Sequence, residues 1–174
     1  MHKVGISGSW RIATMATSPA IEEIKSAVQE SVETIIQVGD GIVSGGALGV
    51  DFWATETALK YASVPDQIKI IIPTPLNIYL DHYRQKSAEG AIDESLYHAL
   101  KFQLNVISAR FKLIEMSYSA CTPETYYSRN TEVVLACNVL NAFVVNGSAG
   151  TMDTVTKANN LGKPVKILAY SLAL

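Results

Sequence analysis

The sequence is poor in the residues that build disulfide frameworks and metal sites. Its two cysteines, Cys121 and Cys137, do not form a Cys-x-x-Cys pair, and its three histidines, His2, His82 and His98, lie far apart in the chain. Disulfide-rich domains and zinc sites need such residues at close, regular spacing. We therefore expect no metal site and no disulfide framework.

Long apolar runs and an excess of one charge are lacking as well. No uninterrupted apolar stretch approaches the roughly 20 residues that cross a bilayer, and the first residues lead into a short apolar strand instead of a signal-peptide core. These features predict a cytoplasmic protein with no membrane partner. The 14 Lys and Arg residues against 16 Asp and Glu give a formal net charge of -2. Any phosphate site must therefore be local, and a nucleic-acid partner is not favoured.

The remaining composition is that of an ordinary folded protein. Hydrophobic residues make up 48% of the chain and charged residues 17%, proportions at which a chain buries a core and does not stay disordered. A length of 174 residues suits one domain, and neither an internal repeat nor a flexible linker divides it. We expect a single domain over residues 1–174.

Short apolar segments alternate with helical patterns along most of the chain. We expect strands at residues 3–7, 41–44, 67–72, 142–145 and 165–169, and helices at about 19–39, 50–61, 123–140 and 152–161. Residues 76–121 are less regular and are expected to form an insertion on the sheet, with a helix at about 92–110 and a short apolar stretch at 111–114. The alternation predicts parallel strands with right-handed crossovers. The expected fold is α/β, a Rossmann-like three-layer sandwich with a mainly parallel sheet and helices on both faces.

A glycine-rich segment, Ser44–Asp51 (SGGALGVD), lies between an expected strand and an expected helix, and contains Gly45, Gly46 and Gly49. Glycines there let backbone N–H groups approach a phosphate, and the helix N-terminus adds partial positive charge. The alternative is a tight turn that needs glycine only for its backbone angles. Taken alone, the segment leaves both interpretations open.

A second glycine turn, Asn146–Thr154 (NGSAGTMDT), follows a later apolar strand. Its N–H and hydroxyl groups suit phosphate or ribose oxygens, and the candidate ligand-binding residues are Gly147, Ser148, Gly150 and Thr151. Because the carboxyl ends of parallel strands share one edge, we expect both turns and Gly8–Ser9 to surround one crevice. Neither turn is a G-x-G-x-x-G motif or a P-loop. The signatures of ordinary NAD and kinase-type NTP sites are therefore lacking. The converging turns leave a nucleotide or related phosphorylated ligand as the candidate, and no cofactor is certain.

The two turns resemble the motifs of a known superfamily. SGGALGVD is similar to the glycine motif of the SLOG superfamily, which joins the LOG-type phosphoribohydrolases with the DNA-processing protein A family. From Tyr126, YYSRN followed by TEVVLACNVLNAFVVNGSAGTMDT resembles the Arg-Asn helix, apolar strand and Gly-Ser-x-Gly-Thr turn of the DNA-processing branch. The resemblance covers about residues 3–169, and residues 76–121 least well. It implies a Rossmann-like nucleotide-binding domain and a homodimer or higher homo-oligomer.

Two departures bear on the activity that the resemblance implies. LOG-type hydrolases end their PGGxGTxxE turn on a catalytic Glu, but here Asn146–Gly147 replaces the Pro-Gly pair and Thr154 stands at the Glu position. An enzyme of this type would need Asp153 or Asp51 as its acid–base group. The DNA-processing branch usually carries a basic residue where this chain has Leu48, which weakens the expectation of strand binding.

Arg129 and Asn130 add charged and amide groups to the candidate site. Arg is the side chain best shaped to hold a phosphate by two parallel hydrogen bonds, and the resemblance favours that contact. Without the resemblance, the better interpretation is an exposed arginine that pairs with Glu124 or Glu132 of its own helix. Asp51 has two equal interpretations, as the partner of a ribose hydroxyl or cation and as a dipole partner at its helix N-terminus.

Trp10 follows Gly8–Ser9 and either stacks on a base or fills a subunit interface. The leading functional hypothesis is the binding of a nucleotide or related phosphorylated ligand at the glycine turns. The alternatives are a LOG-type nucleoside-monophosphate phosphoribohydrolase and a single-stranded DNA binder. Whether the chain is an enzyme stays open at this point.

Overall fold

The computed structural model describes residues 1–173 and contains a six-stranded sheet. Its strands are β1 (Lys3–Gly8), β2 (Gly41–Ser44), β3 (Ile68–Ile72), β4 (Lys112–Glu115), β5 (Val139–Val145) and β6 (Val165–Tyr170). They lie in the order β4-β3-β2-β1-β5-β6, and every neighbouring pair is parallel. The expected parallel α/β sheet is confirmed.

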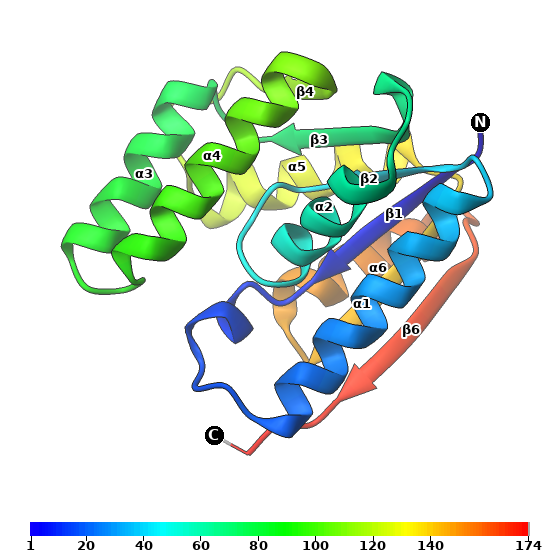
Figure 1. The fold of residues 1–174 in the computed structure, drawn as a ribbon, viewed down its shortest axis with the longest axis horizontal. Helices are drawn as coiled ribbons and strands as arrows, with labels where there is room; N and C mark the ends of the chain where they lie inside the picture. Colours follow the sequence, from blue (N-terminus) through cyan, green and yellow to red (C-terminus); the bar gives the residue numbers. More distant parts are fainter. Residues whose placement is uncertain (174) are drawn as a thin grey trace.

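Helices cover both faces of the sheet. They are α1 (Pro19–Gln37), α2 (Val50–Tyr61), α3 (Leu76–Ala88), α4 (Glu94–Arg110), α5 (Pro123–Ala136) and α6 (Ala149–Asn160), with short 3-10 turns η1 (Arg11–Thr14) and η2 (Pro65–Gln67). Figure 1 shows α1, α2 and α4 in front of the sheet and α5 and α6 behind it. The three-layer arrangement is confirmed.

Helix α1 begins and ends where its sequence signals place it. The Ser18 hydroxyl oxygen accepts a hydrogen bond from the N–H of Ile21, and Pro19 occupies the first helical position. Gly39, at φ +86°, follows the end of the helix. Its inward-facing side is fully buried at Ile24 and Val28. Cap, proline and apolar spacing thus act together to fix this crossover.

The direction of the strand order reverses between β1 and β5. From β1 the chain adds β2, β3 and β4 outward on one side, and from β5 it adds β6 on the other. The two central strands pair in register from Val4↔Val139 to Gly8↔Phe143. In open α/β sheets, such a switch point leaves a crevice at the carboxyl ends of the strands. The fold therefore places the loops after β1 and β5 at the edge of a crevice.

Residues 76–115 form regular elements, so the expected irregular insertion is wrong, although the helix expected at about 92–110 is confirmed as α4. The segment forms α3, α4 and β4, and β4 extends the sheet through the pairs Lys69↔Lys112 to Ile72↔Glu115. The helical pattern of α3 was missed because its buried positions are aromatic, at Tyr79 and Tyr83. The strand was missed because β4 is an edge strand with mostly exposed side chains.

Helix α5 is shorter, and strand β5 longer, than expected. The helix ends at Ala136 and the strand begins at Val139, whereas the apolar residues between them fit either structure. Cys137 adopts extended backbone angles. Lys163, from the loop before β6, donates hydrogen bonds to the carbonyl oxygens of Val134 and Cys137 and so satisfies the helix end. A contact from far along the chain sets this boundary.

Over residues 1–173, no helix is long and apolar enough to cross a membrane. The same described residues contain no group of three or more His, Cys, Asp and Glu side chains that could hold a metal ion. Both cysteines are free thiols.

Candidate functional site

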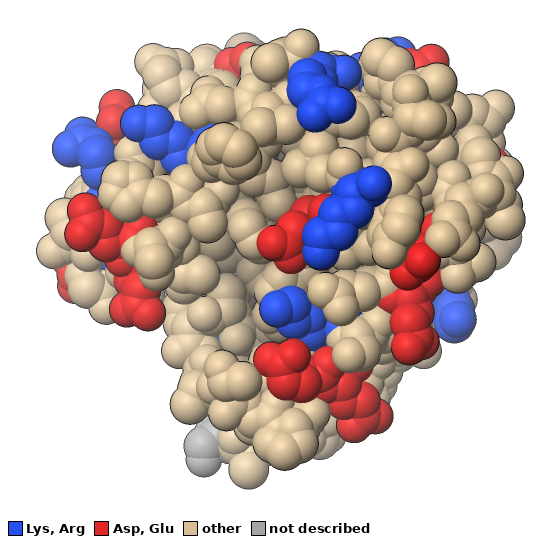
Figure 2. Space-filling view, viewed as in Figure 1, with Lys and Arg blue, Asp and Glu red and all other residues tan. Residues whose placement is uncertain are grey.

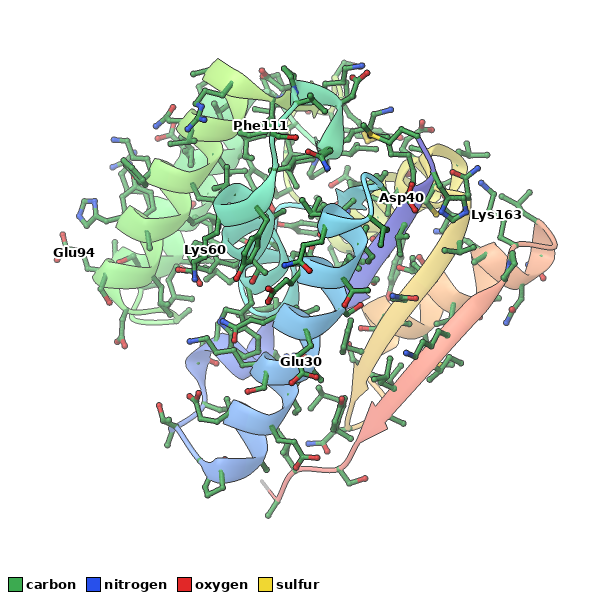
Figure 3. The ribbon with its side chains drawn as sticks, turned by 45° about the vertical axis from the view of Figure 1, so that its right-hand side comes forward. Glu30, Asp40, Lys60, Glu94, Phe111 and Lys163 are labelled. Carbon is green, nitrogen blue, oxygen red and sulfur yellow. The ribbon has the colours of Figure 1, made fainter. Side chains whose placement is uncertain are left out.

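A cavity of about 690 Å³ opens at the carboxyl ends of β1, β2 and β5. Most of the predicted site residues line it, namely Gly8, Ser9, Gly45, Asp51, Arg129, Asn130, Gly147, Ser148, Gly150 and Thr151. Three others, Gly46, Gly49 and Asp153, are not part of its wall. Figure 3 labels Asp40 and Lys163 at the opposite, amino-terminal edge of the sheet, away from the cavity. The glycine turns thus converge on one cavity, as the strand order requires. The predicted site is corrected at the three residues that do not line it.

The first correction concerns Gly46, which faces the core and not the cavity. It lies at φ +66°, and a Cβ there would sit 2.7 Å from Cγ2 of Ile70. Its carbonyl oxygen accepts a hydrogen bond of 3.1 Å from the Tyr79 hydroxyl. A side chain at this position would strain the backbone and push into β3. Gly46 is therefore a packing glycine, and a valine there would damage the fold.

The second correction concerns Gly49, at φ +73° in front of α2. A Cβ here would overlap the carbonyl oxygen of Ser9 and press on the backbone of Trp10. The same Ser9 oxygen accepts a hydrogen bond of 3.4 Å from the N–H of Val50. The N-terminus of α2 is thus covered by the chain that leaves β1. Gly49 permits this close backbone approach and has no cavity-facing surface.

The Asp51 side chain is buried and accepts a hydrogen bond from the first glycine turn. It is only 5% exposed, and its Oδ2 accepts a hydrogen bond of 3.3 Å from the N–H of Ala47. Burial raises the pKa of Asp51, against the opposing field of the Arg129 guanidinium. A protein carboxyl therefore already occupies an N–H group that a phosphate would need.

Arg129 lies within α5 and is 7% exposed. Its Nη1 donates a hydrogen bond to the carbonyl oxygen of Gly45, and its Nε donates one of 3.2 Å to Oδ1 of Asn130. Over residues 1–173, no ion pair joins it to Glu124 or Glu132. The interpretation as an exposed arginine paired on its own helix is therefore wrong. Arg129 braces the first turn and also lines the cavity.

The second glycine turn is open toward the cavity. Asn146 and Gly147 have φ of +49° and +64°, and a Cβ built on Gly147 or Gly150 meets nothing within 4 Å. The N–H groups of Ser148 and Met152 donate to backbone carbonyls. In the described part of the chain, the three N–H groups between them, in the first turn of α6, have no such acceptor. This helix N-terminus faces the cavity with its donors free.

Hydroxyl groups surround the first turn of α6. The Thr151 hydroxyl donates a hydrogen bond of 3.1 Å to the Ser148 hydroxyl. Thr154, at the position of the LOG-type catalytic Glu, is 1% exposed, and its hydroxyl donates to the carbonyl oxygen of Gly150. It accepts a hydrogen bond of 3.3 Å from Ser7. Thr154 therefore joins α6 to β1 and carries no acid–base group.

The third correction concerns Asp153, one of the two candidate acid–base residues. Its Oδ2 accepts hydrogen bonds from Nδ2 of Asn130 at 3.0 Å and from Nζ of Lys157 at 2.7 Å. These bonds turn the carboxylate away from the cavity wall. Among the lining residues, Asp51 is the only acid. Of the two candidate carboxylates, only Asp51 is placed to act as an acid–base group at this site.

Sequence reasoning missed the cavity wall contributed by α3. His82, Tyr83 and Lys86 of this helix line the cavity together with Trp10 and Arg11. Trp10 and Arg11 directly follow Gly8–Ser9, so their place could have been inferred from the sequence. The α3 residues give no such signal because only the packing of the helix brings them to the crevice.

Comparison with solved structures finds proteins of similar fold. DNA processing protein A from Helicobacter pylori, described with a unique single-stranded DNA binding mode, has a TM-score of 0.68 and 23% identity over 98% of this chain and 66% of that one. DNA processing protein A from Streptococcus pneumoniae has a TM-score of 0.60 and 20% identity over 95% of this chain and 50% of that one. TM1055, a structural-genomics target, has a TM-score of 0.56 and 17% identity over 95% and 72%.

No family model and no curated protein matches the sequence. The chain spans just under two thirds of the Helicobacter protein and half of the Streptococcus protein. At these identities the likeness is one of fold, which agrees with the resemblance seen in the two glycine turns. The chain has the Rossmann-type fold of DNA processing protein A.

Proposed function

We propose that this chain binds a nucleotide or related phosphorylated ligand in the cavity, with a phosphate at the N-terminus of α6. The observation that carries the proposal is the open second turn, where Gly147 and Gly150 leave free space beside unpaired N–H groups. Backbone N–H groups and the helix dipole together favour an anion at such a place. The Ser148 and Thr151 hydroxyls add further donors.

The charges around the cavity support an anionic ligand. Its lining includes the cations Arg11, Lys86 and Arg129 and the single acid Asp51, although the whole chain has a net charge of -2. Arg129 uses Nε and Nη1 within the protein. Its Nη2 has no hydrogen-bond partner among residues 1–173 and is the nitrogen that would reach a phosphate.

A matched pair of variants at Gly150 tests the proposal. Gly150→Asp places a carboxylate in the phosphate site, and an acid in the first turn of a helix favours folding. Gly150→Ala adds only a methyl group to open space. We expect Gly150→Asp to weaken adenosine monophosphate binding, measured by calorimetry, by about tenfold or more, while Gly150→Ala stays within about threefold of the parent. Equal affinity in all three proteins would place the phosphate elsewhere.

A second candidate is single-stranded DNA binding, favoured by the fold of the Helicobacter protein. Two observations count against it. Leu48, at the position where the DNA-processing branch usually has a basic residue, is 1% exposed and belongs to the core. On the face seen in Figure 2, Lys and Arg side chains are interspersed with Asp and Glu. Salt separates the two functions, because strand binding weakens steeply with salt and a mononucleotide pocket responds less.

A further inference from the structure

A second group of cations lies at the cavity wall, and the proposed phosphate site does not use it. Nζ of Lys86, from α3, is 5.3 Å from the centroid of the Trp10 ring, and Cζ of Arg11, from η1, is 6.0 Å from that ring. We call these three residues the Trp10 cluster; all of them line the cavity. Two elements far apart in the sequence therefore bring two positive charges to one aromatic ring.

The cations of the Trp10 cluster have no carboxylate within ion-pair distance in the described part of the chain. Within residues 1–173, neither Lys86 nor Arg11 forms an ion pair, whereas Lys112 and Lys157 have carboxylate partners at 2.6 and 2.7 Å. The face of an indole ring attracts cations, but it does not cancel the repulsion between them. A bound anion does cancel it. Two cations that lie near one ring of the cavity wall, without an ion-pair partner among residues 1–173, favour a bound anionic group.

The Trp10 cluster and the N-terminus of α6 lie on different sides of β1. Helix α6 follows β5, which flanks β1 on one side. Lys86 belongs to α3, which follows β3 on the other side, and the backbone of Trp10 packs against Gly49 at the start of α2. The cavity therefore presents two separate positively charged regions to one ligand.

We infer that the ligand carries two separate anionic groups, as a nucleotide does when it bears a second phosphate beyond the one at α6. Arg11 and Lys86 bind that second phosphate, and Trp10 positions the two cations. The inference rests on the proposed function, because the first phosphate is the one at α6. A free nucleoside bisphosphate and two successive phosphates of a single strand share this chemistry.

Calorimetry with two probes tests the inference. We expect adenosine 3′,5′-bisphosphate to bind at least about ten times more tightly than adenosine 5′-monophosphate, because the extra phosphate gains charge-assisted hydrogen bonds. In Lys86→Gln this ratio should fall below about three. The control is Lys25→Gln, because Nζ of Lys25 lies 5.9 Å from the ring of Trp53, outside this cavity. That variant should keep the parental ratio. Thermal melting confirms that both variants are folded.

The outcomes are distinguishable. Equal affinities of the two probes for the parent protein overturn the second phosphate site and leave the first intact. Binding of neither probe overturns the proposed function itself. A preference for the bisphosphate that survives in Lys86→Gln also overturns the role of the Trp10 cluster. A thymidine dinucleotide and a longer thymidine strand separate the two sources. If the affinity rises from one phosphate to two and then stays constant, the ligand is a small nucleotide. If the affinity keeps rising with the length of the strand, the ligand is a single strand.

Discussion

The two glycine turns occupy equivalent places, each between a parallel strand and the helix that follows it. They differ in whether their backbone N–H groups already have acceptors within the protein. In the first turn, the Asp51 carboxyl accepts the N–H of Ala47, and the Ser9 carbonyl accepts the N–H of Val50 at the start of α2. In the second, the first turn of α6 has no such backbone acceptor in the described chain, and Gly150 borders open space. A glycine-rich strand-to-helix turn is therefore available to an anionic ligand only where the protein leaves its N–H donors free. The predictions below test this difference.

The largest expected effect is on stability at the first turn. Gly49→Ala should lower the free energy of unfolding by about 3 kcal/mol, because it forces alanine to a positive φ and against the Ser9 carbonyl. Gly150→Ala should change it by no more than about 1 kcal/mol, since the helix gains a better former in open space. Urea unfolding of both variants gives the comparison. Similar losses at the two positions would mean that the second turn is also packed.

Arg129 both braces the first glycine turn and lines the cavity, so its replacement should lower stability and also weaken nucleotide binding. Arg129→Gln leaves the buried carbonyl of Gly45 without its partner, which costs about 1–3 kcal/mol, and also weakens nucleotide binding by about tenfold. The control is Arg84→Gln, because Arg84 is exposed and, among residues 1–173, pairs only with Asp81 of its own helix. Its effect should stay below about 0.5 kcal/mol. If Arg129→Gln melts like the parent, Arg129 does not brace the first turn.

A smaller effect concerns the pH dependence of stability. Burial, helped by Lys86, lowers the pKa of His82 below 6.5, with Glu89 opposing. The unfolded chain then binds more protons between the two pKa values, so this contribution is present above pH 6.5 and is lost as the pH falls through the folded pKa. His82→Gln should remove this part of the acid destabilisation. His98→Gln, on the exposed side of α4, should not. Unfolding free energies measured from about pH 7 to about pH 5 make the comparison.

The smallest effect is expected in catalysis. Thr154 stands at the LOG-type Glu position with its hydroxyl already bonded to Gly150, so adenosine monophosphate should release little free adenine on incubation with the protein. Chromatography of the products measures this. Rapid release that disappears in Asp51→Asn would assign catalysis to the one acid of the cavity wall and would replace the binding proposal.

The sequence predicted well what local chemistry determines. The Ser18 cap, the apolar spacing of α1 and the glycine turns gave the α/β alternation and the place of the crevice. Prediction from the sequence failed where a contact between residues far apart in the chain determines the local structure. The end of α5 depends on Lys163, and Gly46 faces inward because Tyr79 of α3 approaches it.

For the site, the sequence identified most of the lining residues but could not separate the two turns. Both have a glycine-rich sequence after an apolar strand, and their difference arises from tertiary contacts. The chain leaving β1 covers Gly49, and nothing comparable approaches Gly150. The wall formed by α3 was missed for the same reason, since Lys86 reaches Trp10 only through the folded arrangement.

The pairing of β1 with β5 also bears on how the cavity is assembled. Gly8 lies opposite Phe143, and both strands contribute to the cavity edge, although most of the chain separates them. Joining such distant segments costs loop-closure entropy before any contact is gained, and non-local parallel pairings of this kind form slowly. We therefore expect the cavity to be completed late in folding. A ligand held there binds only chains that have finished this step, and by mass action it raises the share of molecules with both central strands docked.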